Sequence, residues 1–190
     1  ASLLKRWLVR LPGAPTGWAA QTLAGEASLN GRWQGGWHDR GQALQISATG
    51  RVPKLDGNAA GAAASAAWRL RDVQLDISGT LAALALSTQG QLERDTQRLS
   101  LRAGAQIQHT DDTRWEGQVN SLDLTAQDRR RSGVWALRLA QPVALQYQHT
   151  ATSRSLESSS GSVLLTGPNP GTARLHWQSA RWAQTASSGQ

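Results

Sequence analysis

Residues 73–90, VQLDISGTLAALALSTQG, alternate apolar and polar side chains on both sides of Gly79. Alternation with a period of two is typical of a β-strand that has one apolar and one solvent-facing surface. The stretch holds no histidine or cysteine and a single charged residue, so it offers nothing for chemistry. It predicts two strands that meet near Gly79. Its apolar positions are Val73, Leu75 and Ile77, followed by Leu84 and Leu86.

The same alternation recurs from residue 44 to residue 177 and predicts about nine to eleven half-buried antiparallel strands. A slip in parity between Val119 and Leu122 predicts a β-bulge. We expect the apolar positions to share one face, which is the candidate binding surface of the protein. Its predicted residues are Leu44, Ile46, Val73, Leu75, Ile77, Leu84, Leu86, Leu99, Leu101, Ile107, Leu122, Leu124, Trp135, Leu137, Leu139, Val143, Leu145 and Tyr147.

Glycine, aspartate and asparagine interrupt the alternation and predict turns. The predicted turns fall at residues 31, 35–36, 56–58, 79, 90, 111–112, 131–133 and 167–171. Two polar or low-complexity stretches, 58–67 and 149–160, predict loops.

The two ends of the chain differ from this pattern. Residues 3–11, LLKRWLVRL, carry apolar side chains at helical spacing and precede Pro12-Gly13, so residues 1–12 predict a short amphipathic helix. Such a helix either caps a sheet or lies on a membrane surface. Residues 13–182 then form a single β-rich domain, and the patternless residues 183–190 predict a disordered tail. The start at Ala1, without a signal peptide, fits a fragment of a larger protein.

Composition limits the possible functions. The net charge is +7, and 18 of the 20 basic residues are arginine, which reflects either coding bias or a polyanionic partner. Leu, Ile, Val and Phe supply only 35 of 190 residues, a composition close to that of disordered chains, whereas nine tryptophans and the ordered alternation favour a fold. The absence of cysteine excludes disulfides and thiol chemistry.

No arrangement of residues predicts an enzyme, a metal site or a cofactor. The four histidines, at positions 38, 109, 149 and 176, lack the short spacing that metal ligands need. No nucleophile elbow or phosphate-binding glycine loop is present. Arginine next to tryptophan recurs, as in Trp68-Arg69 and Arg114-Trp115, and suggests single-stranded nucleic acid. Neighbouring residues of a strand point to opposite faces, however, so we expect no nucleic-acid partner.

Four stretches in this order resemble the C-terminal region of TamB-like proteins, within the wider AsmA-like group. They are LNGRWQGGW (29–37), RVPKLDG (51–57), LRDVQLDISGTLAALALSTQGQLE (70–93) and SGVWALRLAQPVALQY (132–147). The resemblance implies an all-β fold in which a curled, mostly antiparallel sheet forms a U-shaped apolar trough, often described as a β-taco.

The resemblance also implies a function. TamB-like proteins lie in the periplasm of Gram-negative bacteria, are anchored in the inner membrane, and extend towards a TamA-like outer-membrane barrel. The expected ligand is the phospholipid acyl chain, carried towards the outer membrane, with outer-membrane β-proteins as possible substrates of assembly. The residues leave two alternatives open: a scaffold that pairs with nascent β-strands, and a structural stalk without a ligand.

Overall fold

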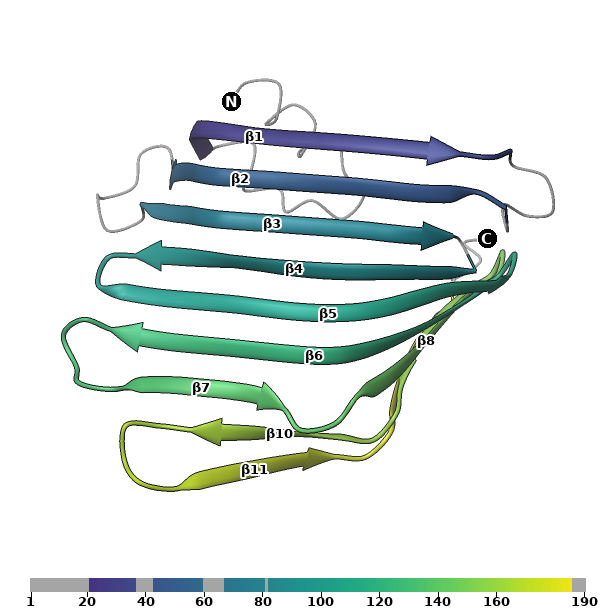
Figure 1. The fold of residues 1–190 in the computed structure, drawn as a ribbon. Helices are drawn as coiled ribbons and strands as arrows, with labels where there is room; N and C mark the ends of the chain where they lie inside the picture. Colours follow the sequence, from purple (N-terminus) through teal and green to yellow (C-terminus); the bar gives the residue numbers. More distant parts are fainter. Residues whose placement is uncertain (1–20, 37–42, 60–66, 81, 186–190) are drawn as a thin grey trace, which may run out of the picture.

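The structure is a computed structural model that describes residues 21–36, 43–59, 67–80 and 82–185 (Figure 1). Within these ranges every regular element is a β-strand, and all strand pairs are antiparallel members of one open sheet, as the sequence predicts. The strands are β1 (Gln21–Gln34), β2 (Gln45–Ala59), β3 (Trp68–Thr80), β4 (Ala83–Arg94), β5 (Gln97–Asp111), β6 (Arg114–Asp128), β7 (Val134–Leu139), β8 (Val143–His149), β9 (Ser153–Ser158), β10 (Gly161–Thr166), β11 (Thr172–Trp177) and β12 (Ala180–Thr185).

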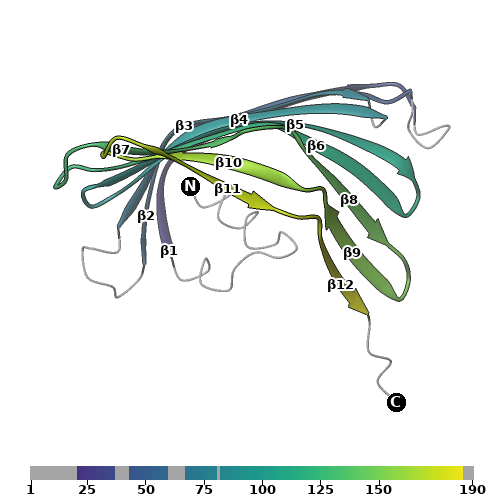
Figure 2. The ribbon, with the colours of Figure 1, turned by 90° about the horizontal axis from the view of Figure 1, so that it is seen from below.

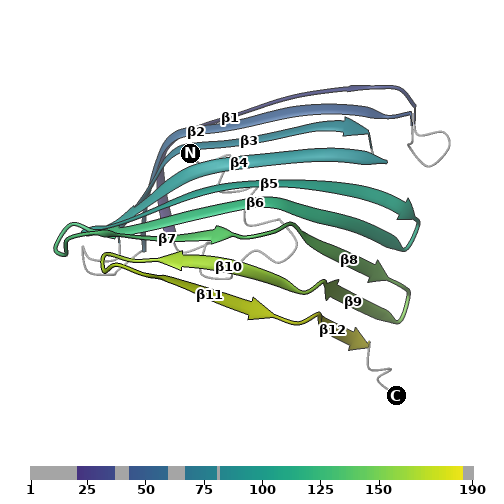
Figure 3. The same ribbon diagram turned by 60° about the horizontal axis from the view of Figure 1, so that its bottom comes forward.

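The chain order of the sheet is a simple meander. Strands β1 to β6 each pair with the next strand along the chain. β6 then pairs with β7 through Asp123–Gln127 and with β8 through Arg114–Val119. Because β10 pairs with β7 and β9 pairs with β8, the six short strands act as three long strands that are each interrupted once (Figure 3). β11 and β12 complete the last of these interrupted strands.

The interruptions lie side by side. They fall at residues 140–142, 159–160 and 178–179, and Pro142 in the first of them cannot donate a ladder hydrogen bond. Across this line, the Ala140 N–H donates to the Ser162 carbonyl at 2.9 Å and the Ser159 N–H donates to the Ala144 carbonyl at 2.9 Å. The sheet therefore stays continuous while its strands change direction. Figure 2 shows the result, an arch that the strands cross from one rim to the other.

Two irregularities keep the alternation in phase along the long strands. Between β5 and β6, Ser121 faces Gly104 and Val119 faces Ala105, which leaves Asn120 as the extra residue of the predicted bulge. The second irregularity includes Pro53 of β2 and Asp72 of β3. The β2–β3 register is the same on both sides of these residues, whereas the register shifts between β1 and β2 at Glu26/Ser28 and between β3 and β4 at Arg71/Gln74. Asp72 has a φ of 51°, a left-handed conformation that a carboxylate residue tolerates better than most. Without this second irregularity, the apolar residues of both strands would change faces halfway along.

Several predicted turns and one predicted loop are wrong. Residues 153–158 form β9, which pairs on both sides, although its sequence holds a single large apolar residue. Gly31, Gly57 and Gly90 lie inside strands. Two of these glycines make room for a large neighbour across the strand: Gly57 faces the Trp68 ring, and Gly90 faces Val73. Glycine here marks a close approach of side chains, which local sequence cannot distinguish from a turn.

Other predictions of the chain's organisation have mixed outcomes. The turns near residues 111–112, 131–133 and 167–171 are confirmed, and the β3–β4 turn follows Gly79 by two residues. The predicted tail starts too early, because Ala183, Gln184 and Thr185 pair with β9. The predicted N-terminal helix, residues 186–190 and most of the predicted loop 58–67 lie outside the described residues.

Substitution of Gly57 tests the glycine–tryptophan packing. A Cβ at this position would overlap the Trp68 indole, so we expect Gly57→Ala to lower the free energy of unfolding by about 1–3 kcal/mol. Gly50→Ala is the matched control on the same strand and face, because its Cβ would meet neighbours at an ordinary 3.8 Å. Urea denaturation measures both variants. Equal stability of the two variants would contradict this packing.

Candidate functional site

The strand register brings the predicted apolar residues to one face of the sheet. One row across the strands reads Ala48, Ile77, Leu86 and Ala105, each opposite the next. Another row reads Leu101, Leu124, Leu137 and Leu165. Every predicted face residue within a strand lies on this surface, and Leu44 immediately precedes β2. We call it the apolar face. It further includes Leu29, Trp33, Val52, Leu55, Trp68, Leu70, Leu92, Trp115, Val119, Leu156, Val163, Leu165, Leu175, Trp177 and Trp182.

The chirality of the chain decides which side of the arch the apolar face occupies. The Arg129 N–H donates to the Thr96 carbonyl. Because hydrogen-bonded pairs alternate with non-hydrogen-bonded pairs along an antiparallel ladder, Arg98, Ser100 and Arg102 of β5 are also hydrogen-bonded to their partners on β6. In Figure 1, β5 runs from left to right and β6 lies below it. In a strand of L-residues with this orientation, the residues that are hydrogen-bonded to the lower strand point their side chains towards the viewer. The polar side chains therefore face the viewer. The sheet arches away from that viewer in Figure 2, so the apolar face lines the inside.

The apolar face is only partly buried. Among the described residues, Leu44, Leu55 and Val143 are the buried hydrophobic residues. Leu75, Leu92 and Leu101, in the middle strands, are 36–38% exposed, and Trp33 near one rim is 75% exposed. No strand packs over this surface within the described part of the chain. A large, contiguous, exposed apolar surface of this kind marks an interaction site in a soluble protein.

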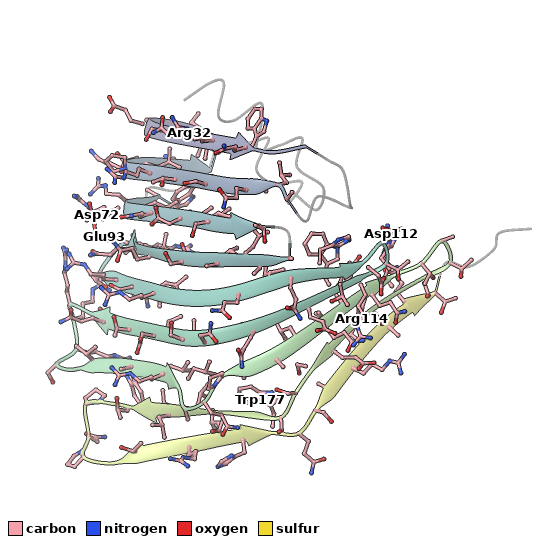
Figure 4. All side chains as sticks on the ribbon, turned by 45° about the vertical axis from the view of Figure 1, so that its right-hand side comes forward. Arg32, Asp72, Glu93, Asp112, Arg114 and Trp177 are labelled. Carbon is pink, nitrogen blue, oxygen red and sulfur yellow. The ribbon has the colours of Figure 1, made fainter. Side chains whose placement is uncertain are left out.

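All six tryptophans within the described residues belong to the apolar face. Trp68 and Trp135 lie at the starts of β3 and β7, at one rim, and Trp33, Trp115 and Trp182 lie towards the other rim. Trp177 lies at the line of interruptions, where its Nε1–H donates to the Ser159 carbonyl at 3.2 Å (Figure 4). An indole combines an apolar body with one polar N–H, so it suits a boundary between an apolar surface and water.

Three of these rings pack against glycines of a neighbouring segment. The glycine partners of Trp68, Trp135 and Trp177 are Gly57, Gly167 and Gly161, and a Cβ at any of the three would run into the ring. Pairing of a strand glycine with a neighbouring aromatic ring restores the packing that glycine lacks. These pairs hold the rings against the sheet.

The opposite face is polar and carries ion pairs between neighbouring strands. Arg138 Nε lies 2.6 Å from Asp123, and Arg69 Nε lies 2.5 Å from Asp56. Arginines that neighbour tryptophans in sequence, such as Arg69 and Arg114, therefore lie across the sheet from those rings, as predicted. Exposed ion pairs contribute little stability each, so their main effect is to keep this face hydrated.

One ion cluster is less exposed than the rest. Glu93 accepts hydrogen bonds from Arg98 at 2.7 and 3.0 Å and from Arg71 at 3.1 Å, and Arg129 Nη2 lies 3.8 Å from it. The Glu93 side chain is 14% exposed. We call these four residues the Glu93 cluster. The hydrogen bond from Arg98 and the charge of Arg71 hold the pKa of Glu93 below its ordinary value, against the opposing effect of burial.

No group of three or more metal-binding side chains gathers within the described residues. No helix long and apolar enough to cross a membrane occurs among them either. The chain matches no family model, no curated protein and no solved structure.

Sequence reasoning missed several members of the apolar face. Leu55 and Leu70 lie beyond the irregularity at Pro53 and Asp72, where the parity of the pattern changes. A proline followed by such a change is a detectable signal of an irregular strand. Leu156 and Trp182 lie in the polar stretches of β9 and β12, where one or two apolar residues give no periodicity.

Truncation of face residues distinguishes a covered from an uncovered surface. We expect Leu55→Ala to cost about 2–4 kcal/mol of unfolding free energy, because this side chain is 5% exposed. Leu101→Ala should cost about 1 kcal/mol or less, because the side chain is already 37% exposed. Urea denaturation measures both values. Equally large losses would mean that the apolar face is covered in solution.

The Glu93 cluster predicts a pH dependence. Because the folded-state pKa of Glu93 lies below its ordinary value of 4.5, the folded protein binds fewer protons than the unfolded chain in this range. Its stabilisation is fully present above pH 4.5 and is lost as the pH falls through the lowered folded-state pKa. The difference in unfolding free energy between the parent protein and Glu93→Gln should therefore shrink as the pH falls below 4.5. Urea denaturation at a series of pH values measures it. A difference independent of pH would contradict this role of Glu93.

Proposed function

We propose that this chain is a segment of a TamB-like periplasmic protein that shields phospholipid acyl chains on its way to the outer membrane. In this proposal the arch is a U-shaped trough, and the parent protein is anchored in the inner membrane of a Gram-negative bacterium. The observation that carries the proposal is the uncovered apolar face on the inner side of the sheet, from Leu29 on β1 to Leu175 on β11.

The proposed mechanism is physical. Removal of an acyl chain from water is worth about 0.8 kcal/mol for each buried CH₂ group. The rows of leucine, isoleucine, valine and alanine run across consecutive strands and therefore along the trough. An acyl chain that moves from one row to the next exchanges one apolar contact for an equivalent one, so its free energy changes little. This transport needs neither a catalytic residue nor a cofactor.

The polar groups of the lipid need a separate place. The trough is open along its length, because no second sheet faces it within the described residues. A headgroup can remain in water at this opening or at a rim while the acyl chains lie against the sheet. The indoles of Trp68 and Trp135 at one rim suit the transition between the two environments.

A second candidate function is a scaffold for outer-membrane β-proteins. Within the described residues, β1 pairs only with β2, and the last interrupted strand pairs only with β10 and β9. Free edges of this kind accept another strand by β-augmentation. A TamA-like barrel, contacted through the full-length parent, and nascent outer-membrane strands are the proposed partners of such edges. This function uses the edge backbone, whereas lipid transport uses the apolar face.

Photo-crosslinking tests the lipid proposal. Photoreactive residues replace Leu75, Leu101 and Leu137 on the apolar face, and separately their polar-face neighbours Gln74, Arg102 and Arg138. In cells, we expect phospholipid to label the apolar-face set at least about tenfold more than the polar-face set, because acyl chains have no favourable contact with the hydrated surface. Mass spectrometry of the crosslinked protein identifies the adducts.

The matched pairs make the outcome decisive. Each pair occupies neighbouring positions of the same strand, so local exposure to the periplasm and to membranes is similar. Labelling by lipid that does not depend on the face would contradict the proposal. Labelling confined to edge strands, by protein rather than lipid, would favour the scaffold function.

A further inference from the structure

Arginines concentrate at one rim of the sheet. Arg94 and Arg98 flank the β4–β5 turn, and Arg129, Arg130 and Arg131 form the start of the β6–β7 turn. These two turns are adjacent, since the Arg129 N–H donates to the Thr96 carbonyl at 2.9 Å. One rim of the sheet therefore carries a cluster of five arginines.

At the opposite rim, acidic side chains outnumber basic ones around the β5–β6 turn. There, the β5–β6 turn carries Asp111 and Asp112, and Arg114 lies 2.7 Å from Glu116. An anion in solution would thus be drawn to the arginine rim rather than to this one.

A hollow opens at the arginine rim and is lined by residues of both faces. Its volume is about 750 Å³, and it is lined by Arg69, Arg71, Arg98 and Arg129 together with Asp56, Glu93 and Asp95. Asn58 and Gln97 also line it. The lining carries more positive than negative charge and is rich in hydrogen-bond donors.

Glu93 holds the guanidinium groups of Arg71 and Arg98 in place but does not use all of their N–H donors. Arg71 binds it through Nε, and Arg98 binds it through Nε and Nη2. A guanidinium group has five N–H donors, so each arginine keeps further donors for a second acceptor. Arg71 and Arg98 are each 42% exposed and Arg129 is 65% exposed, so these donors are accessible.

The backbone beneath the arginines is also ordered. Asp128 accepts hydrogen bonds from the Thr96 hydroxyl at 2.8 Å and from the Arg130 N–H at 3.0 Å. The Arg131 N–H donates to the Asp128 carbonyl at 2.9 Å. The arginine turn is thus tied to the β4–β5 turn, which lowers the entropy lost when an anion binds.

The apolar face ends at this same place. Leu92 faces Leu99 on the apolar face, and the next pair, Glu93 and Arg98, points to the polar face just before the turn. An acyl chain that lies over Leu92 and Leu99 places its polar end at the arginine rim. The next group of a phospholipid after its acyl chains and glycerol is a phosphate, which arginine binds through paired N–H donors.

We propose that Arg71, Arg98 and Arg129 bind a phosphate group at this rim. The proposal rests on the proposed function where it takes that phosphate from a phospholipid headgroup; free phosphate is the other source of the same chemistry.

Isothermal titration of the full 190-residue chain tests the site with three probes. They are dihexanoylphosphatidylglycerol, inorganic phosphate, and dihexanoylglycerol, which has the same acyl chains but no phosphate. Arg71→Gln/Arg98→Gln removes two charges from the Glu93 cluster. The matched control, Arg102→Gln/Arg138→Gln, removes two charges from the same face at a different hollow.

We expect the cluster variant to bind dihexanoylphosphatidylglycerol at least about tenfold more weakly than the parent chain, and the control less than about twofold more weakly. Dihexanoylglycerol should bind all three proteins alike. Arg129→Gln changes a more exposed side chain with little effect on folding, and should weaken phosphatidylglycerol binding by about threefold. Circular dichroism checks that each variant is folded.

The probes separate the possible failures. The phosphate site is overturned if the cluster and control variants lose the same binding affinity. It is also overturned if neither variant binds either phosphate probe more weakly than the parent chain. If the cluster variant binds only inorganic phosphate more weakly, the site is supported and its ligand is free phosphate. If dihexanoylglycerol binds none of the proteins, the acyl-chain function fails, while the dependence of phosphate binding on Arg71 and Arg98 still decides this inference.

Discussion

The structure depends on one constraint, the two-residue period of the strands held in phase across the whole sheet. Cross-strand pairing places Leu101, Leu124 and Leu137 side by side, and the same pairing places Arg102, Asp123 and Arg138 side by side on the other face. A slip of one residue in any strand would exchange its two faces. The bulge at Asn120 and the irregularity at Pro53 and Asp72 prevent that exchange where the strands are longest.

Curvature turns this two-faced sheet into a surface that can receive a ligand. The interruptions at Pro142, Ser159–Ser160 and Gln178–Ser179 let the last strands change direction within one sheet, and the apolar face lies inside the resulting arch. Because no second layer covers that face within the described residues, its side chains remain between a third and three quarters exposed at many positions. The described part of the chain thus lacks the filled core of a β-sandwich and leaves its apolar face accessible.

The two rims of the sheet differ in their charged residues, whereas the apolar face between them is nearly uniform. Tryptophans lie towards both rims, and arginines gather at the rim where Trp68 and Trp135 pack against glycines. An amphiphile on this sheet would therefore find equivalent apolar contacts along the inside of the arch and unequal electrostatic surroundings at its two sides. The proposed acyl-chain and phosphate sites are two parts of one amphipathic surface.

The sequence by itself determined the all-β class, the presence of strands between Val73 and Tyr147, the parity of the apolar face there and the bulge near Asn120, because these depend on local alternation. It did not reveal β9, the strand interiors at Gly57 and Gly90, or the membership of Leu55 and Leu156 in the face, because those depend on partners distant in the chain. Only the tertiary structure decided that the apolar face is uncovered and lies inside the arch, and that Arg71, Arg98 and Arg129 meet around Glu93. Curvature and charge clustering arise when strands pair across the sheet, and a period along one strand carries no information about either.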